Sequence, residues 1–202
     1  MAIAEQLAFS LTEERRGIHV LLWDDMTALF QMLLVTRAAL GDLPVEPFLI
    51  SEQEARFDLL KKTILSRISD QLDHEWESET DFPPLAPHPL WLLFIQQAAS
   101  RHVGSRLNGW RSLLAEPFGT LIVVRNADFD EFQRSAPDLA SFIGPRIYDA
   151  SRTLMVCSSQ TRGRLEKTLP EQFMEILREL PGALPSHQEL RDWEPLVEED
   201  EG

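Results

Sequence analysis

The chain has 202 residues, 44% of them hydrophobic, and its 33 acidic and 19 basic residues give a formal net charge of −14. This length is enough for one sizeable core, which favours a single globular domain over a disordered chain. The negative charge argues against a surface that grips nucleic-acid phosphates, whereas it permits a basic protein partner.

Cysteine usage and hydropathy exclude further classes. Cys157 is the only cysteine, which excludes an intramolecular disulfide and a zinc site of several thiolates, and which fits a reducing cytosol. No apolar run approaches the roughly 20 residues that cross a bilayer, and acidic residues interrupt residues 1–17, so these are not an export signal. We therefore predict a cytoplasmic protein with no membrane contact and no cofactor.

The first elements are a helix, a strand and a second helix. Residues 2–9 have the pattern of a short amphipathic helix, and Ile18–Trp23 is a short apolar run that predicts the first strand. Asp24 or Asp25 then caps a helix with apolar residues at three- and four-residue spacing, which Gly41 ends.

A second strand and a long helix follow. Val45–Ile50 is the second candidate strand, and its internal Pro47 places it near an edge or at a bulge. A capping box that begins at Ser51 opens a helix with an apolar stripe as far as Leu72. Four prolines in the next stretch predict an extended loop over residues 82–89.

A third strand and a helix come next, and a strand, a helix and a strand that follow them form the most complete pattern of the chain. Leu90–Ile95 has no polar residue, which suits a central strand, and residues 96–115 are predicted to be helical. The fourth strand is residues 120–124, and the helical region after it ends at Gly144. We expect residues 152–157 to be the fifth strand, parallel to the fourth.

These elements predict one α/β domain with three layers, in which helices cover both faces of about five mostly parallel strands. A last helix spans residues 171–180. We expect residues 1–17 to be a helical strap and residues 18–182 to be the domain. Residues 183–202 are then an acidic tail, docked on the surface and partly disordered, with Trp193 as a candidate anchor.

The turn after the first strand lacks a phosphate-binding motif. In an α/β domain with parallel strands, ligands sit beyond the carboxyl ends of the strands. A phosphate-binding loop places G-x-x-x-x-G-K-[ST] after the first strand, because backbone amides and one lysine wrap the phosphates. This chain has WDDMT there, and Asp24 and Asp25 would repel a polyphosphate. We therefore predict no nucleotide site.

The other strand ends also lack catalytic groups. The third strand runs into Gln96 and Gln97, and these neutral amides coordinate magnesium poorly and cannot act as carboxylate bases. The fourth strand ends in Arg125 and Asn126, at a position where such folds often sense the nucleotide. We favour a structural role there, in capping the strand end.

Two segments carry a family resemblance. Residues 107–124, LNGWRSLLAEPFGTLIVV, and residues 136–144, APDLASFIG, resemble the corresponding segments of bacterial STAND NTPases, which are relatives of NLR-type immune receptors. The matching positions are Asn108, Arg111, Pro137, Asp138 and Ser141. Because the phosphate loop and the acid are missing, the closer similarity is to the inactive STAND domains of prokaryotic conflict systems, with a degenerate P-loop NTPase-like fold.

The resemblance implies a pseudo-NTPase without enzymatic activity. Such a domain is expected to act as an adaptor or regulator in antiviral defence or stress signalling, where it accompanies a caspase-like or other protease effector. We expect Asp138 to cap or brace the backbone, and Phe142 to pack in the core. Exposed aromatic residues are expected to anchor the protein partner. The candidate partner-binding residues are Trp23, Asp24, Asp25, Trp110, Arg125 and Trp193.

Two alternative functions stay open. The first is an acidic inhibitor that sequesters a basic regulator and is released by proteolysis. The second is a cysteine peptidase that uses Cys157, which would need a histidine base beside it. None of the five histidines follows a strand end in the expected way, so a buried, unreactive cysteine is favoured.

Overall fold

The computed structural model describes most of the chain, with gaps. The described residues are 2–13, 17–51, 61–62, 65–66, 90–96, 100–115, 119–150 and 155–198. Most of the predicted helix from Ser51 to Leu72 and all of the Pro-rich loop 82–89 lie outside them.

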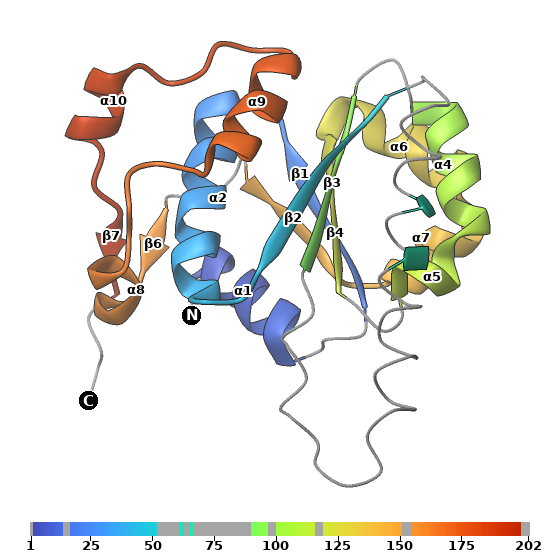
Figure 1. Ribbon diagram of the computed structural model, residues 1–202, viewed down its shortest axis with the longest axis horizontal. Helices are drawn as coiled ribbons and strands as arrows, with labels where there is room; N and C mark the ends of the chain where they lie inside the picture. The colour runs from blue at the N-terminus through green and yellow to red at the C-terminus, as the bar shows by residue number, and fades with distance from the viewer. Residues whose placement is uncertain are drawn as a thin grey trace, which may run out of the picture.

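A five-stranded parallel sheet forms the centre of the molecule (Figure 1). Its order is β2-β3-β4-β1-β5. The strands are β1 (Ile18–Trp23), β2 (Val45–Ile50), β3 (Leu90–Ile95), β4 (Thr120–Arg125) and β5 (Ile147–Asp149). Every residue of β1 and β3 is buried, as their largely apolar runs predict for strands covered on both faces, and the one polar residue of these two strands, His19, is buried as well. β2 lies at an edge, as its proline predicts.

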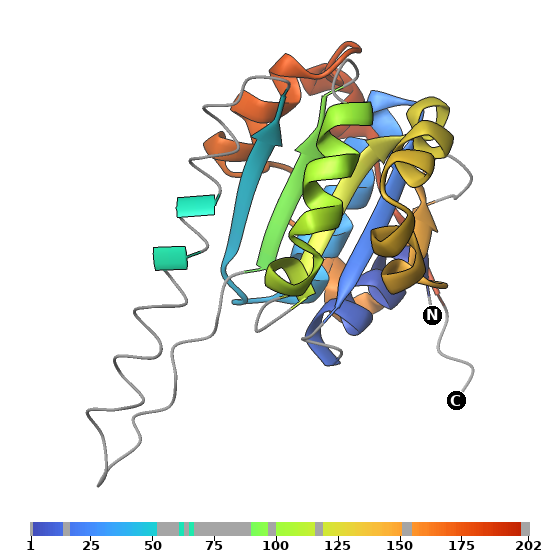
Figure 2. The same cartoon turned by 90° about the vertical axis from the view of Figure 1, so that its right-hand side faces the viewer.

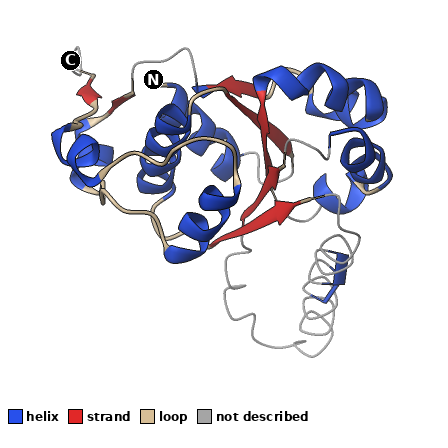
Figure 3. Cartoon of the chain, turned by 90° about the horizontal axis from the view of Figure 1, so that it is seen from above, coloured by secondary structure: helices blue, strands red, loops and turns tan. Residues whose placement is uncertain are grey.

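Helices cover both faces of this sheet (Figure 3). One face is covered by α1 (Ile3–Glu13), α2 (Met26–Leu40) and α9 (Glu171–Glu179). The other is covered by α4 (Ser100–Gly109), α5 (Arg111–Ala115), α6 (Asn126–Ser135) and α7 (Pro137–Ile143), as Figure 2 shows. Each layer has its own apolar cluster against the sheet. The predicted three-layer α/β class is confirmed, and the arrangement is consistent with a P-loop-like fold.

The prediction for the fifth strand is wrong. The strand beside β1 is β5, which follows the α7 turn at Gly144 almost directly. Within residues 152–157, only Met155 to Cys157 are described, and β6 (Val156–Cys157) pairs instead with β7 (Leu196–Val197) in a separate two-stranded sheet. An apolar run predicts a buried strand, but its partner is set by distant residues, in this case by the C-terminal part of the chain.

Two predicted helices are each divided. The helix predicted over residues 96–115 is interrupted at Trp110, between α4 and α5. The helical region before Gly144 is interrupted at Ala136, because Pro137 has no N–H to continue the hydrogen bonding of α6 and instead begins α7. The short helix α8 (Ser159–Gly163) follows β6. In the tail, residues 183–198 are described, and they form α10 (His187–Asp192) and β7.

Candidate functional site

The candidate site lies where the connections of two neighbouring strands diverge. From the carboxyl end of β1 the chain enters α2 on one face of the sheet, and from that of β4 it enters α6 on the other (Figure 1). Ligands of open α/β sheets bind outside the carboxyl ends of the strands at such a switch point. We call the residues at these two strand ends, 23–25 and 125–126, the strand-end site.

The strand-end site brings together four of the six predicted residues. Trp23 and Arg125 are register partners at the ends of β1 and β4, and the guanidinium carbon of Arg125 lies 5.8 Å from the centroid of the Trp23 ring. The side-chain amide of Asn126 donates a 3.2 Å hydrogen bond to Asp24. Asp25 completes the group at the start of α2. Asn126 was expected to cap the end of its own strand, and its side chain also contacts Asp24, the residue that follows the neighbouring strand β1.

The carboxylate of Asp25 occupies the N-terminus of α2. It accepts a 2.8 Å hydrogen bond from the backbone N–H of Ala28, so Asp25 is the predicted N-cap. In a phosphate-binding loop, the N–H groups and the positive end of the helix dipole at this position hold the phosphate. Here a carboxylate of the chain itself supplies the negative charge.

The segment that follows α9 packs against the start of α2. A Cβ atom added to Gly182 would lie 3.2 Å from Cβ of Met26, and Gly182 has a φ of 126°, which other residues rarely adopt. The turn between β1 and α2 is therefore approached by a part of the chain more than a hundred residues away in the sequence. Sequence reasoning missed this contact, and a Pro-Gly pair after a helix indicated only that the helix ends.

The strand-end site combines acidic groups with buried N–H donors. Burial raises the pKa of Asp128, which follows in α6; the nearby Arg125 charge opposes this rise, and Glu131 adds to it. Among the described residues, the buried Nε1 of Trp23 and Nε of Arg125 have no hydrogen-bond partner. Of these groups, the exposed carboxylate of Asp24 is the one that a basic group could approach from solvent, whereas the Trp23 and Arg125 donors are buried.

The three tryptophans do not form one surface. Trp23 is only 1% exposed and belongs to the core beneath α2, so the expectation of an exposed anchor there is wrong. Successive side chains of a strand point to opposite faces of the sheet, and the ring of Trp23 lies on the face that α2 covers. Trp110 and Trp193 are half-buried and pack against the clusters on opposite faces of the sheet. Neither belongs to the strand-end site.

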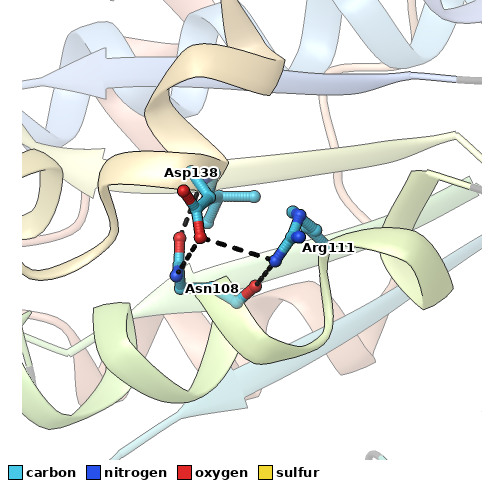
Figure 4. A network of polar contacts seen from close by, with 4 residues as sticks. Asn108, Arg111 and Asp138 are labelled. Atoms are coloured by element: carbon cyan, nitrogen blue, oxygen red, sulfur yellow. Dashed lines mark hydrogen bonds and ion pairs between the residues drawn. The ribbon is translucent and has the colours of Figure 1, made fainter.

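The residues that carry the family resemblance contact one another (Figure 4). The side-chain amide of Asn108 donates to Asp138 over 3.1 Å, and its oxygen accepts from the backbone N–H of Leu139 over 2.8 Å. Arg111 lies 3.6 Å from the Asp138 carboxylate. Asp138 thus braces α7 through its contacts with the side chains of Asn108 and Arg111, whereas the hydrogen bond to the backbone of α7 comes from Asn108. Phe142 is 51% exposed, so the expectation that it packs in the core is wrong.

Asn108→Ala is expected to lower the free energy of unfolding by about 0.5–2 kcal/mol, because α7 has no cap from its own N-cap residue, Ala136, and Asn108 replaces it. Arg111→Ala is the matched control. Its ion pair with Asp138 is 40% and 61% exposed at the two side chains, so its loss is expected to cost less than about 1 kcal/mol. Urea denaturation of both variants measures the difference, and equal losses would contradict the capping role.

The environment of Cys157 does not favour a nucleophile. Its side chain is fully buried. Burial raises the pKa of the Cys157 thiol, the nearby Glu5 charge raises it further, and Arg162 lowers it in part. Reactive cysteines have a lowered pKa and are partly exposed, which is the opposite arrangement.

Glu5 links α1 to the β6 region, a contact that sequence reasoning missed. Its Oε1 accepts hydrogen bonds from the backbone N–H of Ser158, at 2.7 Å, and from the Thr161 hydroxyl, at 2.6 Å. Burial raises the pKa of Glu5, but the hydrogen bonds from Thr161 and Ser158 outweigh it and leave the pKa below its ordinary value of 4.5.

A lowered pKa in the folded state makes the Glu5 carboxylate a source of stability above its unfolded pKa, and this stability is lost as the pH falls through the folded value. Glu5→Gln is therefore expected to reduce the free energy of unfolding at pH 7, by an amount that shrinks as the pH falls below about 4.5. Urea denaturation at pH 7 and at lower pH tests this. Glu175→Gln, at an exposed position of α9, makes the same charge change, and an equal pH dependence in that variant would refute the assignment to Glu5.

The described residues form neither a metal-binding cluster nor a membrane-spanning helix. No group of three or more His, Cys, Asp or Glu side chains in the described ranges is placed to hold a metal ion. None of the helices in the described part of the chain is long and apolar enough to cross a membrane.

The fold and the strand-end site define an α/β protein of P-loop-like layering, with acidic residues at the position of the phosphate loop. No protein-family model matches the chain, and neither a curated protein nor a solved structure matches it.

Proposed function

We propose that this protein is a catalytically inactive, P-loop-like module that binds a protein partner through the strand-end site. The observation that carries the proposal is the Asp25 carboxylate at the N-terminus of α2, 2.8 Å from the Ala28 nitrogen. A phosphate bound there would have to displace this carboxylate and approach Asp24 as well, so like charges oppose nucleotide binding.

The end of β3 supports the same proposal. β3 is followed by Gln96, whose backbone N–H donates to Ile50 over 2.9 Å and whose side chain is a neutral amide. Active nucleotide hydrolases hold magnesium through an acid, which an amide replaces poorly. The resemblance to inactive STAND domains adds the setting: a cytoplasmic antiviral or stress-signalling system of bacteria, with a caspase-like or other protease effector as the partner.

The nucleotide part of the proposal is tested by thermal denaturation with magnesium and ATP. A ligand at a hundred times its dissociation constant stabilises a protein by about 2.7 kcal/mol. We expect no shift with ATP, GTP or ADP, and no phosphate release. The same measurement is made on Asp25→Ala, because this change removes the carboxylate that caps the N-terminus of α2. A shift in the unaltered protein would overturn the proposal.

The partner is identified by site-specific crosslinking in the native host. A photoreactive amino acid at Ala127, exposed beside Asn126, is expected to capture the partner, whereas the same group at Ser141, exposed on α7, is not. The captured protein is then purified and its affinity measured by titration calorimetry. Capture at both positions to the same extent would remove the strand-end site as the interface.

A second candidate function follows from the net charge of −14. An acidic inhibitor would hold a basic regulator through its overall field, which salt screens. Two charge reversals separate the candidates. Asp24→Lys is expected to weaken the captured complex at least tenfold if the strand-end site is the interface, and Glu175→Lys, exposed on α9, is expected to change it little. Equal effects of both, with a steep salt dependence, would favour the inhibitor.

A further inference from the structure

The C-terminal segment, which we define as residues 186–198, is held by few contacts. Its strand β7 pairs with β6 over two residues of each strand, and the backbone N–H groups of Leu196 and Glu198 donate to the carbonyls of Met155, over 2.9 Å, and Cys157, over 3.1 Å. Two side-chain contacts that join the segment to the rest of the described chain are exposed. These are a 2.7 Å ion pair of Arg162 with Glu194 and a 3.1 Å hydrogen bond from Lys167 to the Arg191 carbonyl. Exposed ties of this kind contribute little stability.

The segment buries a limited apolar surface: Pro195 is buried, and Leu190 and Trp193 are half-buried and pack against the core. None of the residues of α10 is buried, and Leu196 is 55% exposed. Trp193 is half-buried and is the largest side chain that the segment packs against the core. By contrast, α9 buries Phe173 and Leu177. Gly182 and Leu184 still pack against the rest of the protein, so the boundary between tightly and loosely held chain falls after Leu184, at the start of the segment.

What the segment covers is the strand β6. In the described part of the chain, β6 pairs with β7 alone, and Cys157 faces Val197 in the register of that pair. The Cys157 side chain is fully buried. If the segment leaves, the backbone groups of β6 lose their partners and become an open strand edge.

We infer that residues 186–198 are a detachable segment that opens as a unit while the rest of the protein stays folded, and that its opening uncovers the edge of β6. Local opening requires less free energy where few apolar contacts and few backbone hydrogen bonds are lost, and both conditions hold here. The opened segment presents Trp193 and Leu196 among acidic residues, and the chain continues as Glu-Asp-Glu-Gly after Glu198. The opening of residues 186–198 does not depend on the proposed function of the strand-end site.

The single cysteine makes the opening measurable, because a thiol reagent modifies only Cys157. The labelling rate is followed in the full chain at fixed pH in low concentrations of urea. Opening of the segment exposes little surface, so we expect labelling to depend weakly on urea, with a slope far below that of global unfolding. A slope equal to the global value, together with exchange of the Leu196 and Glu198 amides only by complete unfolding, would overturn the inference, because neither the thiol nor the backbone of β7 would then open separately.

Trp193→Ala is expected to accelerate the labelling about tenfold or more while the urea midpoint of the sheet changes little. Trp110→Ala is the matched control, since Trp110 is also half-buried but packs on the opposite face of the sheet. It is expected to leave labelling in low urea unchanged. Arg162 is not a suitable target, because its charge lowers the pKa of the Cys157 thiol and thereby alters reactivity directly.

Hydrogen exchange gives a readout that needs no variant. The amides of Leu196 and Glu198, which donate to the carbonyls of Met155 and Cys157, are expected to exchange together and faster than the amides of β3 and β4. Exchange of these two amides at the rate of the central strands would contradict the inference, as would equal labelling rates in the two tryptophan variants.

Discussion

Phe94→Ala is expected to lower the free energy of unfolding by about 3–5 kcal/mol, the loss typical of a fully buried phenylalanine. Phe94 is 0% exposed in β3, and its ring meets that of Phe173 in α9 edge to face, with centroids 6.3 Å apart. The truncation therefore leaves a cavity between the sheet and a helix that the chain adds late in the sequence. Urea denaturation followed by circular dichroism measures the loss.

Phe142→Ala is the matched control for this truncation. The same side chain is removed, but Phe142 is 51% exposed on α7, so the free energy of unfolding is expected to change by less than about 0.5 kcal/mol. A loss of several kcal/mol in the control would show that Phe142 is covered in solution, and a small loss for Phe94 would place the core elsewhere.

Gly104→Ala is expected to lower the free energy of unfolding by about 1–3 kcal/mol, because α4 and α6 approach closely at this glycine. A Cβ atom at position 104 would collide with the Ser135 hydroxyl and would lie 3.1 Å from the Phe132 carbonyl oxygen. The hydroxyl can move, but the carbonyl belongs to the backbone of α6 and is fixed. Only a shift of one helix relieves the second contact.

Two further variants test this close approach by urea denaturation. Adding Ser135→Ala to Gly104→Ala is expected to recover part of the loss, since it removes the hydroxyl but leaves the carbonyl contact. Gly109→Ala, at the end of the same helix, is expected to stabilise the protein by about 0.4–1 kcal/mol. Its φ is not positive, and an added Cβ atom would meet nothing within 4 Å among the described residues. Losses of the same size at both glycines would reject the steric explanation.

The strand-end site shows how much of a candidate site can be predicted from the positions of the strands in the sequence. Asp24 and Arg125 were predicted as candidates at the carboxyl ends of the first and fourth strands, and the structure places these two strand ends side by side. Asp25 was predicted as a cap from its residue type and position, and it is one. The burial of Trp23 was not predicted, because the side to which a strand's last side chain turns depends on the helix packed there.

The sequence by itself determined the elements with strong local signals. Predominantly apolar runs predicted β1, β3 and β4, because strands covered on both faces have no side that must be polar. The proline of β2 indicated an edge or a bulge, and β2 is an edge strand; the acidic turn after β1 indicated the N-cap of α2, which is Asp25.

Only the tertiary structure decided which distant segments meet. It placed β5 beside β1 and paired β6 with β7, brought Gly182 against the start of α2, and joined Glu5 to Ser158. The physical reason is that strand pairing and close packing depend on complementary surfaces that lie far apart in the chain. Local hydrophobic periodicity shows that a residue is buried, whereas it contains no information about which surface buries it.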